Sequence, residues 1–245
     1  METMDLINTD HAIHDKHSVT EIYQKGSWQR KAFNDFEETM TNKESPFPCV
    51  FGVHGLKQGH LRFLFHSHID IALLSQQLRE YVKNSRNFGN NTSLVLFTNI
   101  DQRLEIDEYH SIFWDTLKGL TENDSQPWPA EIPKATDDPK WEFCFAGEPI
   151  FVVCNTPSHV MRYSRHSTHF MLTFQPRWVF DNILGSPEQA KKAFLKVRNI
   201  LKKYDATPLS PDLGMYGDPG ILESRQYFLD DINKTKECPF KHLGD

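Results

Sequence analysis

The chain has 245 residues, of which 38% are hydrophobic, 12% aromatic and 24% charged, and its formal net charge is −6 at pH 7. This balance is typical of one soluble folded domain and excludes an intrinsically disordered chain. The negative charge and a pI near 6.0 also argue against a general binder of nucleic acids or anionic membranes, because such binding needs a basic face.

The N-terminal residues show no targeting signal. Residues 1–23 lack a basic stretch followed by an apolar one, and no run in the chain reaches the roughly 18 apolar residues that span a bilayer. We therefore expect a cytoplasmic protein without a membrane partner, in which residues 1–18 form a flexible segment. The cysteines form no C-x-x-C pair, which argues against a covalent haem site, and all are expected to be free thiols: Cys49, Cys144, Cys154 and Cys238.

In the first half of the chain, hydrophobic spacing predicts helices that alternate with strands. Residues 19–41 carry apolar side chains at helical spacing and predict an opening helix, which Pro46 and Pro48 prevent from continuing. Four further elements are expected in this half from their periodicity and composition: strands at 61–66 and 93–98, and helices at 71–82 and about 107–120.

The second half begins with a stretch that is too broken for a regular element. Residues 123–141 contain four prolines and predict a long ordered surface loop. Three closely spaced strands follow in "EFCFAG", "PIFVVCN" and "HFMLTF", and then a helix at 187–204 with proline in its first turn. The whole pattern predicts a single α+β domain over 1–245, with a mixed, mainly antiparallel sheet flanked by helices.

The segment "CNTPSHVMRYSRHSTHF", residues 154–170, concentrates imidazole and guanidinium groups. On a helix, His159, Arg162 and His166 would share one face. His166 and His169 add further donors for a metal, although no H-E-x-x-H motif is present. A zinc site and simple exposed loop histidines both remain open interpretations of this segment.

Apolar strands on both sides of this segment predict an enclosed small-molecule pocket. Haem suits such a pocket, because its macrocycle needs apolar walls, its propionates need arginines and its iron needs an axial ligand. Ordinary core packing is the alternative explanation for the aromatic residues, which are Trp141, Phe143, Phe145, Phe151, Phe170, Phe174 and Trp178.

Two carboxylates close to this segment are candidates for binding a substrate. Glu142 and Glu148 lie in "WEFCFAGEP", where either could hold a guanidinium group by a bidentate pair. The alternative is that each forms a salt bridge with an arginine of the chain itself.

Several motifs, in order from about residue 46 to the end, resemble the YqcI/YcgG family of bacterial proteins. They are "FPCVFG" (47–52), "LRF" (61–63), "PWP" (127–129), "WEFCFAGEPIFVVCNTPSHVMRYSR" (141–165), "FQPRWVF" (174–180), "YGD" (216–218) and "CPF" (238–240). The resemblance implies a haem-dependent oxygenase that hydroxylates a guanidine nitrogen of arginine or a related small molecule. Ser158 stands where the family pattern has alanine.

On this basis we expect non-covalent haem b with His159 as the axial ligand, and His166 or His169 in reserve. Arg162, Arg165 or Arg177 would pair with the propionates, and the pocket would also include Phe145, Asn155 and Trp178.

The expected substrate is a guanidino compound or amino acid held by Glu142 or Glu148, oxidised with dioxygen and an electron donor or with peroxide. A cysteine at 49, 144 or 154 is the alternative iron ligand. A haem sensor without turnover and a non-haem metal protein built on the histidines are the alternative functions, and a homodimer is the default assembly.

Overall fold

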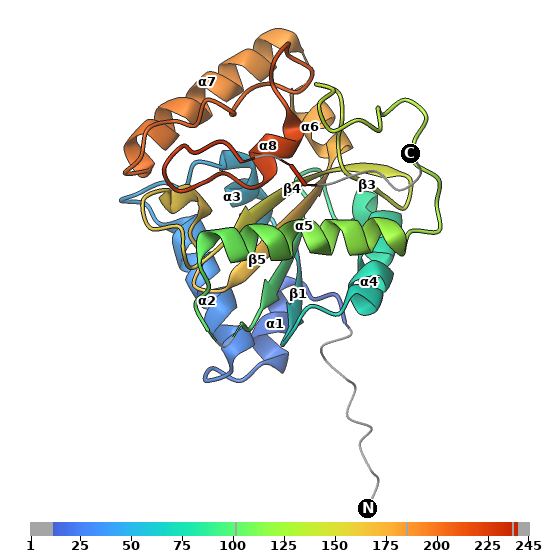
Figure 1. Ribbon diagram of the computed structural model, residues 1–245. Helices are drawn as coiled ribbons and strands as arrows, with labels where there is room; N and C mark the ends of the chain where they lie inside the picture. The colour runs from blue at the N-terminus through green and yellow to red at the C-terminus, as the bar shows by residue number, and fades with distance from the viewer. Residues whose placement is uncertain (1–11, 101, 185, 237, 240–245) are drawn as a thin grey trace, which may run out of the picture.

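The computed structural model describes residues 12–100, 102–184, 186–236 and 238–239 (Figure 1). The helices are α1 (Lys16–Ile22), α2 (Trp28–Thr41), α3 (Val50–Lys57), α4 (Ile71–Asn84), η2 (Ser85–Asn87), α5 (Ile106–Glu122), η3 (Tyr163–Arg165), α6 (Arg177–Leu184), α7 (Pro187–Tyr204) and α8 (Glu223–Tyr227). The strands are β1 (Arg62–His66), β2 (Leu94–Thr98), β3 (Cys144–Phe145), β4 (Glu148–Asn155) and β5 (Phe170–Pro176).

The strands form one five-stranded sheet in the order β1-β2-β5-β4-β3. The β1–β2 pair is parallel, with α4 as the crossover helix between the two strands, whereas the β2–β5, β5–β4 and β4–β3 pairs are antiparallel. The sheet is therefore mixed. The expected α+β fold in a single domain is confirmed.

Each face of the sheet has a different covering. One face packs against α4 and α5, which runs across the sheet in Figure 1, and its strand residues are Leu64, Leu94, Leu96, Ile150, Val152, Cys154, Phe170, Leu172 and Phe174. Part of the opposite face packs under α1 and α2 through Phe63, Phe65, Val95, Phe97 and Met171. Because strand side chains alternate between faces, the remaining residues of this second face are available to line a site.

The strands and three of the helices lie where hydrophobic spacing predicted them. The predicted helices 71–82, 107–120 and 187–204 correspond to α4, α5 and α7. The side chains of Asp70 and Ser186 cap α4 and α7, and at the start of α5 the Glu108 carboxylate accepts from the Glu105 backbone N–H at 2.8 Å. The loop predicted over 123–141 contains no helix or strand. Among the described helices, none combines the length and the apolar composition needed to cross a membrane.

The predicted opening helix was wrong, because residues 19–41 fall in two helices. The chain leaves α1 at Tyr23 in extended conformation, and the hydroxyl of Ser27 caps the start of α2 by accepting from Arg30 N at 3.3 Å. The prediction that residues 1–18 are flexible is also wrong for 12–18. His14 is buried, and its backbone pairs with that of Phe63. Residues 1–11 lie outside the described part.

Three short α-helices of the described chain, α3, α6 and α8, were not predicted from the sequence. Helix α3 starts directly after Pro46 and Pro48, and α6 directly follows β5. Both are too short to show a clear hydrophobic period of the kind that predicts a helix. Helix α3 matters for the site because its N-cap residue is Cys49.

Gly55 holds α3 close against the neighbouring loop. A Cβ atom at this position would lie 2.3 Å from the backbone oxygen of Asn91, a contact that requires the backbone to move. We expect Gly55→Ala to lower the free energy of unfolding by about 1–3 kcal/mol, measured by urea denaturation. Gly26→Ala is the matched control, because a Cβ at Gly26 meets nothing within 4 Å. Equal stability of the two variants would contradict the close approach.

Candidate active site

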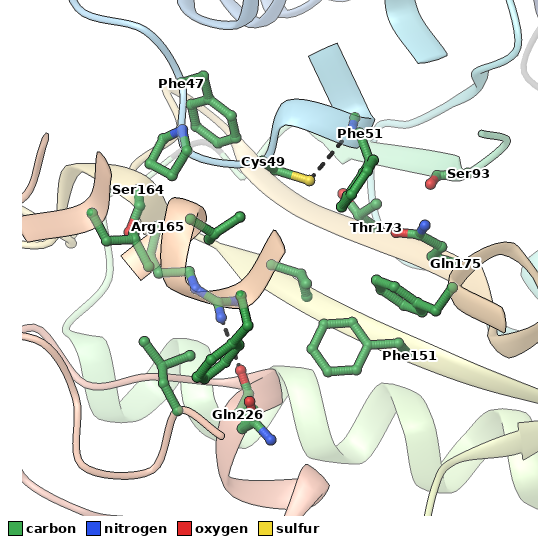
Figure 2. Close-up of a pocket in the computed structure, with 18 of the residues that line it drawn as sticks. Phe47, Cys49, Phe51, Ser93, Phe151, Ser164, Arg165, Thr173, Gln175 and Gln226 are labelled. Atoms are coloured by element: carbon green, nitrogen blue, oxygen red, sulfur yellow. Dashed lines mark hydrogen bonds between the residues drawn. The ribbon is translucent and has the colours of Figure 1, made fainter. Parts of the chain in front are cut away.

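The second face of the sheet forms the floor of a cavity of about 690 Å³ (Figure 2). This volume lies within the range of sites that hold a cofactor or a drug-sized ligand. Side chains from α2, α3, α6, α7 and the C-terminal segment 213–229 form its walls, and most of them are apolar.

Strand alternation decides which residues of the sheet reach this cavity. On β4, Phe151, Val153 and Asn155 line the cavity, whereas their neighbour Cys154 faces the opposite core. Burial raises the pKa of the Cys154 thiol well above its ordinary value. Cys144 is buried away from this cavity, in β3. Neither of these two cysteines can therefore meet a ligand in the cavity.

Helix α7 presents an apolar stripe to the cavity. The stripe consists of residues three or four positions apart, which share one helix face: Ala190, Ala193, Phe194, Val197 and Leu201. Phe194, Val197 and Leu201 are only half-buried, since they face the hollow and not a packed core. An apolar ligand in the cavity would complete the burial of this stripe.

Cys49 is the cysteine that lines the cavity. It is the N-cap of α3, and its Sγ accepts a hydrogen bond from Gly52 N at 3.4 Å. A Cβ at Gly52 would lie 3.2 Å from this Sγ, so glycine leaves space beside the sulfur. Desolvation raises the pKa of the thiol, while the backbone N–H groups of Gly52 and Phe51 and the charge of Arg165 oppose that rise. Cys49 is an exposed residue that lines the cavity, so its accessible surface is open to a ligand there.

The three arginines expected to bind propionates all line the cavity, but their partners differ. Arg162 lies 3.8 Å from a carboxylate oxygen of Asp205 and donates to the Asp230 carbonyl oxygen at 2.7 Å, so it ties its loop to the C-terminal segment. Arg177 is held between two carboxylates.

Arg165 is buried without a carboxylate partner among the described residues. Its guanidinium donates only to the carbonyl oxygens of Gln226, at 2.9 Å, and Tyr227, at 3.3 Å (Figure 2). Desolvation and the nearby charge of Arg162 lower its pKa to about 10. The Asp205 carboxylate acts on Arg165 only through space, and a buried cation that faces a cavity without an ion-pair contact is a candidate site for an anionic group.

Glu142 and Glu148 both form salt bridges with arginines of the chain, which was the alternative to a role in substrate binding. Neither of them lines the cavity. Glu148 pairs with Arg86 at 3.1 Å, with most of the Arg86 side chain exposed. Glu142 is fully buried and accepts two hydrogen bonds from Arg177, at 2.6 and 2.7 Å. The predicted role of these two glutamates as a substrate grip is thus not supported by their positions.

Arg177 binds a second carboxylate, that of Glu223, at 2.5 Å. Glu223 is buried and, unlike Glu142, lines the cavity. Desolvation raises the pKa of Glu142 to about 7 against the opposing charge of Arg177, and it raises the pKa of Glu223 as well. Burial alone would lower the pKa of Arg177, but the two glutamates raise it above its ordinary value. The triad carries a net negative charge only while both carboxylates are ionised, and burial opposes that ionisation.

The contacts of His159 argue against its predicted role as the iron ligand. Its ring is fully buried and does not line the cavity. Nε2 donates to the carbonyl oxygen of Leu229 at 2.8 Å, which leaves Nδ1 to accept from the hydroxyl of Thr156 at 2.9 Å. Both ring nitrogens are thus occupied, Nε2 by the C-terminal segment and Nδ1 within the loop itself.

The other two histidines point elsewhere. His166 Nδ1 donates to the backbone oxygen of His159 at 2.9 Å, and the ring of His169 lies 5.8 Å from that of Trp28. The segment forms a loop with one short 3-10 turn and not the helix that would align these rings. Within the described residues, no three side chains of His, Cys, Asp or Glu are grouped to hold a metal ion.

The remaining predicted pocket residues divide between cavity and core. Asn155 lines the cavity and donates to the Ser164 backbone oxygen at 3.2 Å. Phe145 is buried in the core beneath α5, and Trp178 lies 5.2 Å beneath the Arg86 guanidinium, so neither lines the cavity.

Sequence reasoning missed Ser93, Thr173, Gln175 and Glu223 as cavity residues. The alternation of Thr173 and Gln175 with apolar neighbours in "MLTFQP" was a signal that one face of this strand is polar. Ser93 and Glu223 carried no comparable signal, because each comes close to the cavity only through tertiary contacts.

The buried neutral His159 predicts a measurable pH dependence. Desolvation lowers its pKa to about 4, so its contribution to stability is complete above the unfolded value of about 6.5 and is lost as pH falls toward 4. The stability difference between wild type and His159→Gln should therefore shrink by about 2 kcal/mol from pH 7 to pH 5. Urea denaturation of both proteins at both pH values measures it. An unchanged difference would mean that the ring is not held neutral.

The fold and the site together define a single-domain α+β protein whose sheet forms the floor of a cavity of ligand size. The chain belongs to the YqcI/YcgG family, whose sequence pattern matches residues 36–241. This confirms the resemblance seen in the motifs.

Two of its relatives are proteins of Bacillus subtilis (strain 168). The chain is 37% identical to YqcI over 244 residues, covering 92% of this chain and 96% of YqcI, and 39% identical to YcgG over 225 residues, covering 88% and 89%. It is also 32% identical over 229 residues to a Streptomyces lavendulae protein named "Putative N(omega)-hydroxy-L-arginine synthase DcsA", covering 89% of this chain and 85% of that protein. No solved structure matches the chain.

Proposed function

We propose that this protein is a haem-dependent N-oxygenase that hydroxylates a guanidine nitrogen of arginine or a related small molecule. One observation carries the proposal: an apolar cavity of about 690 Å³ brings together a thiol, a buried carboxylate and a buried guanidinium that has no ion-pair contact with a carboxylate in the described part of the chain. The name of the Streptomyces relative, an N(omega)-hydroxy-L-arginine synthase, supports the reaction.

The donor groups of the cavity fit haem. Cys49 would supply a sulfur donor to the iron, Arg165 would pair with a propionate, and the apolar stripe of α7 would contact the macrocycle. The two donor types differ in availability: the nitrogen atoms of His159 are already bonded, whereas the sulfur of Cys49 has a free surface toward the cavity. We therefore place Cys49 before His159 as the residue that would hold the iron.

Bound haem would activate dioxygen or peroxide, and the substrate nitrogen would take up an oxygen atom. With dioxygen, one oxygen enters an N–O bond and the other leaves as water, which requires two electrons and two protons from an external donor. With hydrogen peroxide the same product and water form without a donor. The protein must accordingly bind the substrate, orient its nitrogen and keep bulk water out.

The residues of the chain would perform these tasks through charge and burial. The Cys49 thiol, whose pKa burial raises, must lose its proton when it binds a metal, so cofactor uptake should release a proton. The N–H groups of Phe51 and Gly52 would then stabilise the negative sulfur. Arg165 would hold an acid group at the side of the cavity where Figure 2 shows it.

The test is to express the protein with a haem precursor, measure bound haem and then supply L-arginine with either dioxygen and a reductant or peroxide. We expect stoichiometric haem and an L-arginine product that contains an added oxygen atom on the guanidine, identified by mass spectrometry. Protein that stays colourless after incubation with haem would contradict the proposal. Haem-loaded protein that leaves guanidino compounds unchanged under both oxidants would instead favour the haem-sensor alternative.

A further inference from the structure

One corner of the cavity floor is polar, in contrast to its surroundings. Ser93, Thr173 and Gln175 lie on the cavity face of the sheet, and Figure 2 shows them gathered on the side away from Ser164 and Arg165. The β2–β5 register pairs Leu94 with Phe174, so Ser93 lies opposite Gln175 one position beyond the paired residues. The three side chains therefore form one patch, which we call the polar corner.

The side chains of the polar corner have no hydrogen-bond partner among the described residues. Ser93 is only 4% exposed, yet its hydroxyl bonds to none of the described groups, and the same holds for the side chains of Thr173 and Gln175. Thr173 and Gln175 are half-buried and line the cavity with Ser93, so the polar groups of the corner are open to whatever fills the cavity. A ligand that brings hydrogen-bonding groups into this corner would find free partners there.

An ion-pair triad lies next to the polar corner in the chain. Gln175 is followed after Pro176 by Arg177, which both Glu142 and Glu223 bind. When both carboxylates are ionised, two negative charges face one guanidinium, and of the two carboxylates Glu223 is the one that lines the cavity, together with Arg177. One oxygen of Glu223 meets Arg177 and the other accepts from the Gln226 amide at 3.2 Å, so each oxygen retains capacity for a further donor.

We propose that Glu223 and the polar corner form the subsite for the guanidinium group of the substrate. Glu223 supplies the countercharge, and the oxygens of Ser93, Thr173 and Gln175 accept from its N–H groups. This assignment rests on the proposed function for the identity of the substrate, because a guanidinium is the planar cation with many N–H donors that such a set of acceptors fits.

The charge pattern of the cavity supports a cationic group of the ligand beside Glu223 and the polar corner, and an acid group of the ligand beside Arg165. Arg165 and the polar corner lie on different sides of the cavity in Figure 2, and Arg165 is the buried cation without a carboxylate partner in the described residues. An acid group near Glu223 would meet like charge, whereas a guanidinium there would neutralise the excess of the triad.

Isothermal titration calorimetry with L-arginine and with L-citrulline, its uncharged analogue, tests the subsite in protein with and without haem. We expect Glu223→Gln to weaken L-arginine binding by at least about tenfold and Gln175→Met by a few-fold, with L-citrulline binding weaker and insensitive to Glu223→Gln. Glu148→Gln is the matched control, because Glu148 also pairs with an arginine but does not line the cavity.

The outcomes separate this subsite from the proposed function. Wild-type affinity for L-arginine in both Glu223→Gln and Gln175→Met would overturn the subsite, whatever the haem content. Wild-type protein that binds L-arginine with this dependence on Glu223 but takes up no haem would support the subsite and overturn the oxygenase. Gln175→Met changes no charge, so it tests the subsite even if Glu223→Gln disturbs the triad.

Discussion

A Cys49→Ala variant is expected to lose haem affinity by at least about tenfold, since removing even an outer partner of a metal ligand costs 10–100-fold. The physical reason is the loss of the cavity-facing sulfur. The ferrous carbon monoxide complex of wild type should absorb as thiolate-ligated haem does, and the complex of the variant should not. Haem titration and this absorption spectrum measure the two effects.

Two further variants serve as controls for Cys49. Cys154→Ala removes a thiol on the opposite face, so its spectrum should remain that of wild type. Cys49→Ser keeps a side chain that can cap α3, which separates loss of ligation from the roughly 0.5–2 kcal/mol that a lost cap costs. If Cys49→Ala retains a thiolate spectrum, or if His159→Gln loses the haem while it stays folded, the ligand is not Cys49.

An Arg165→Met variant is expected to bind haem about 10–100-fold more weakly than wild type. Its guanidinium is the buried cation that lacks a carboxylate partner in the described part of the chain, and a hydrogen bond to a charged group is worth about 1.5–3 kcal/mol. Methionine keeps much of the length and the apolar contact but removes the charge. The rate at which the loaded protein loses haem to a scavenging protein measures the change.

Arg86→Met is the control for the loss of a guanidinium. Arg86 pairs with Glu148 and keeps most of its side chain in solvent, so this variant should release haem at the wild-type rate. Urea denaturation of both haem-free variants checks that each retains the fold. Identical haem release by Arg165→Met and wild type would show that no acid group of the ligand meets Arg165.

Local sequence patterns predicted much of the fold, because helices and strands depend mainly on residues that are close together in the chain. Helix α4 shows this clearly: apolar residues at helical spacing start after the capping residue Asp70, and the helix runs from Ile71 to Asn84. The prediction of one opening helix failed because a local break in the backbone outweighs the average spacing of apolar residues. Extended backbone at Tyr23 and a new cap at Ser27 divide it.

The site was harder to predict, because burial and partners come from residues far apart in the sequence. His159 looked like a ligand beside two other histidines, yet its Nε2 bonds to the Leu229 oxygen, 70 positions away. Arg162 and Arg177 also found partners at long range, whereas Arg165 found only carbonyl oxygens. Of these three arginines, Arg165 is therefore the one without an ion-pair contact to a described carboxylate.

By itself, the sequence determined the α+β class, most of the helices and strands and the family, because these depend on local periodicity and ordered motifs. The tertiary structure alone decided which functional groups share a cavity. The order of the strands and their alternation bring Ser93 and Gln175 together and turn Cys154 to the opposite face. The N-terminus of α3 then places Cys49 above that floor. Strand pairing and helix packing bring together residues far apart in the chain, which hydrophobic periodicity along the sequence cannot reveal.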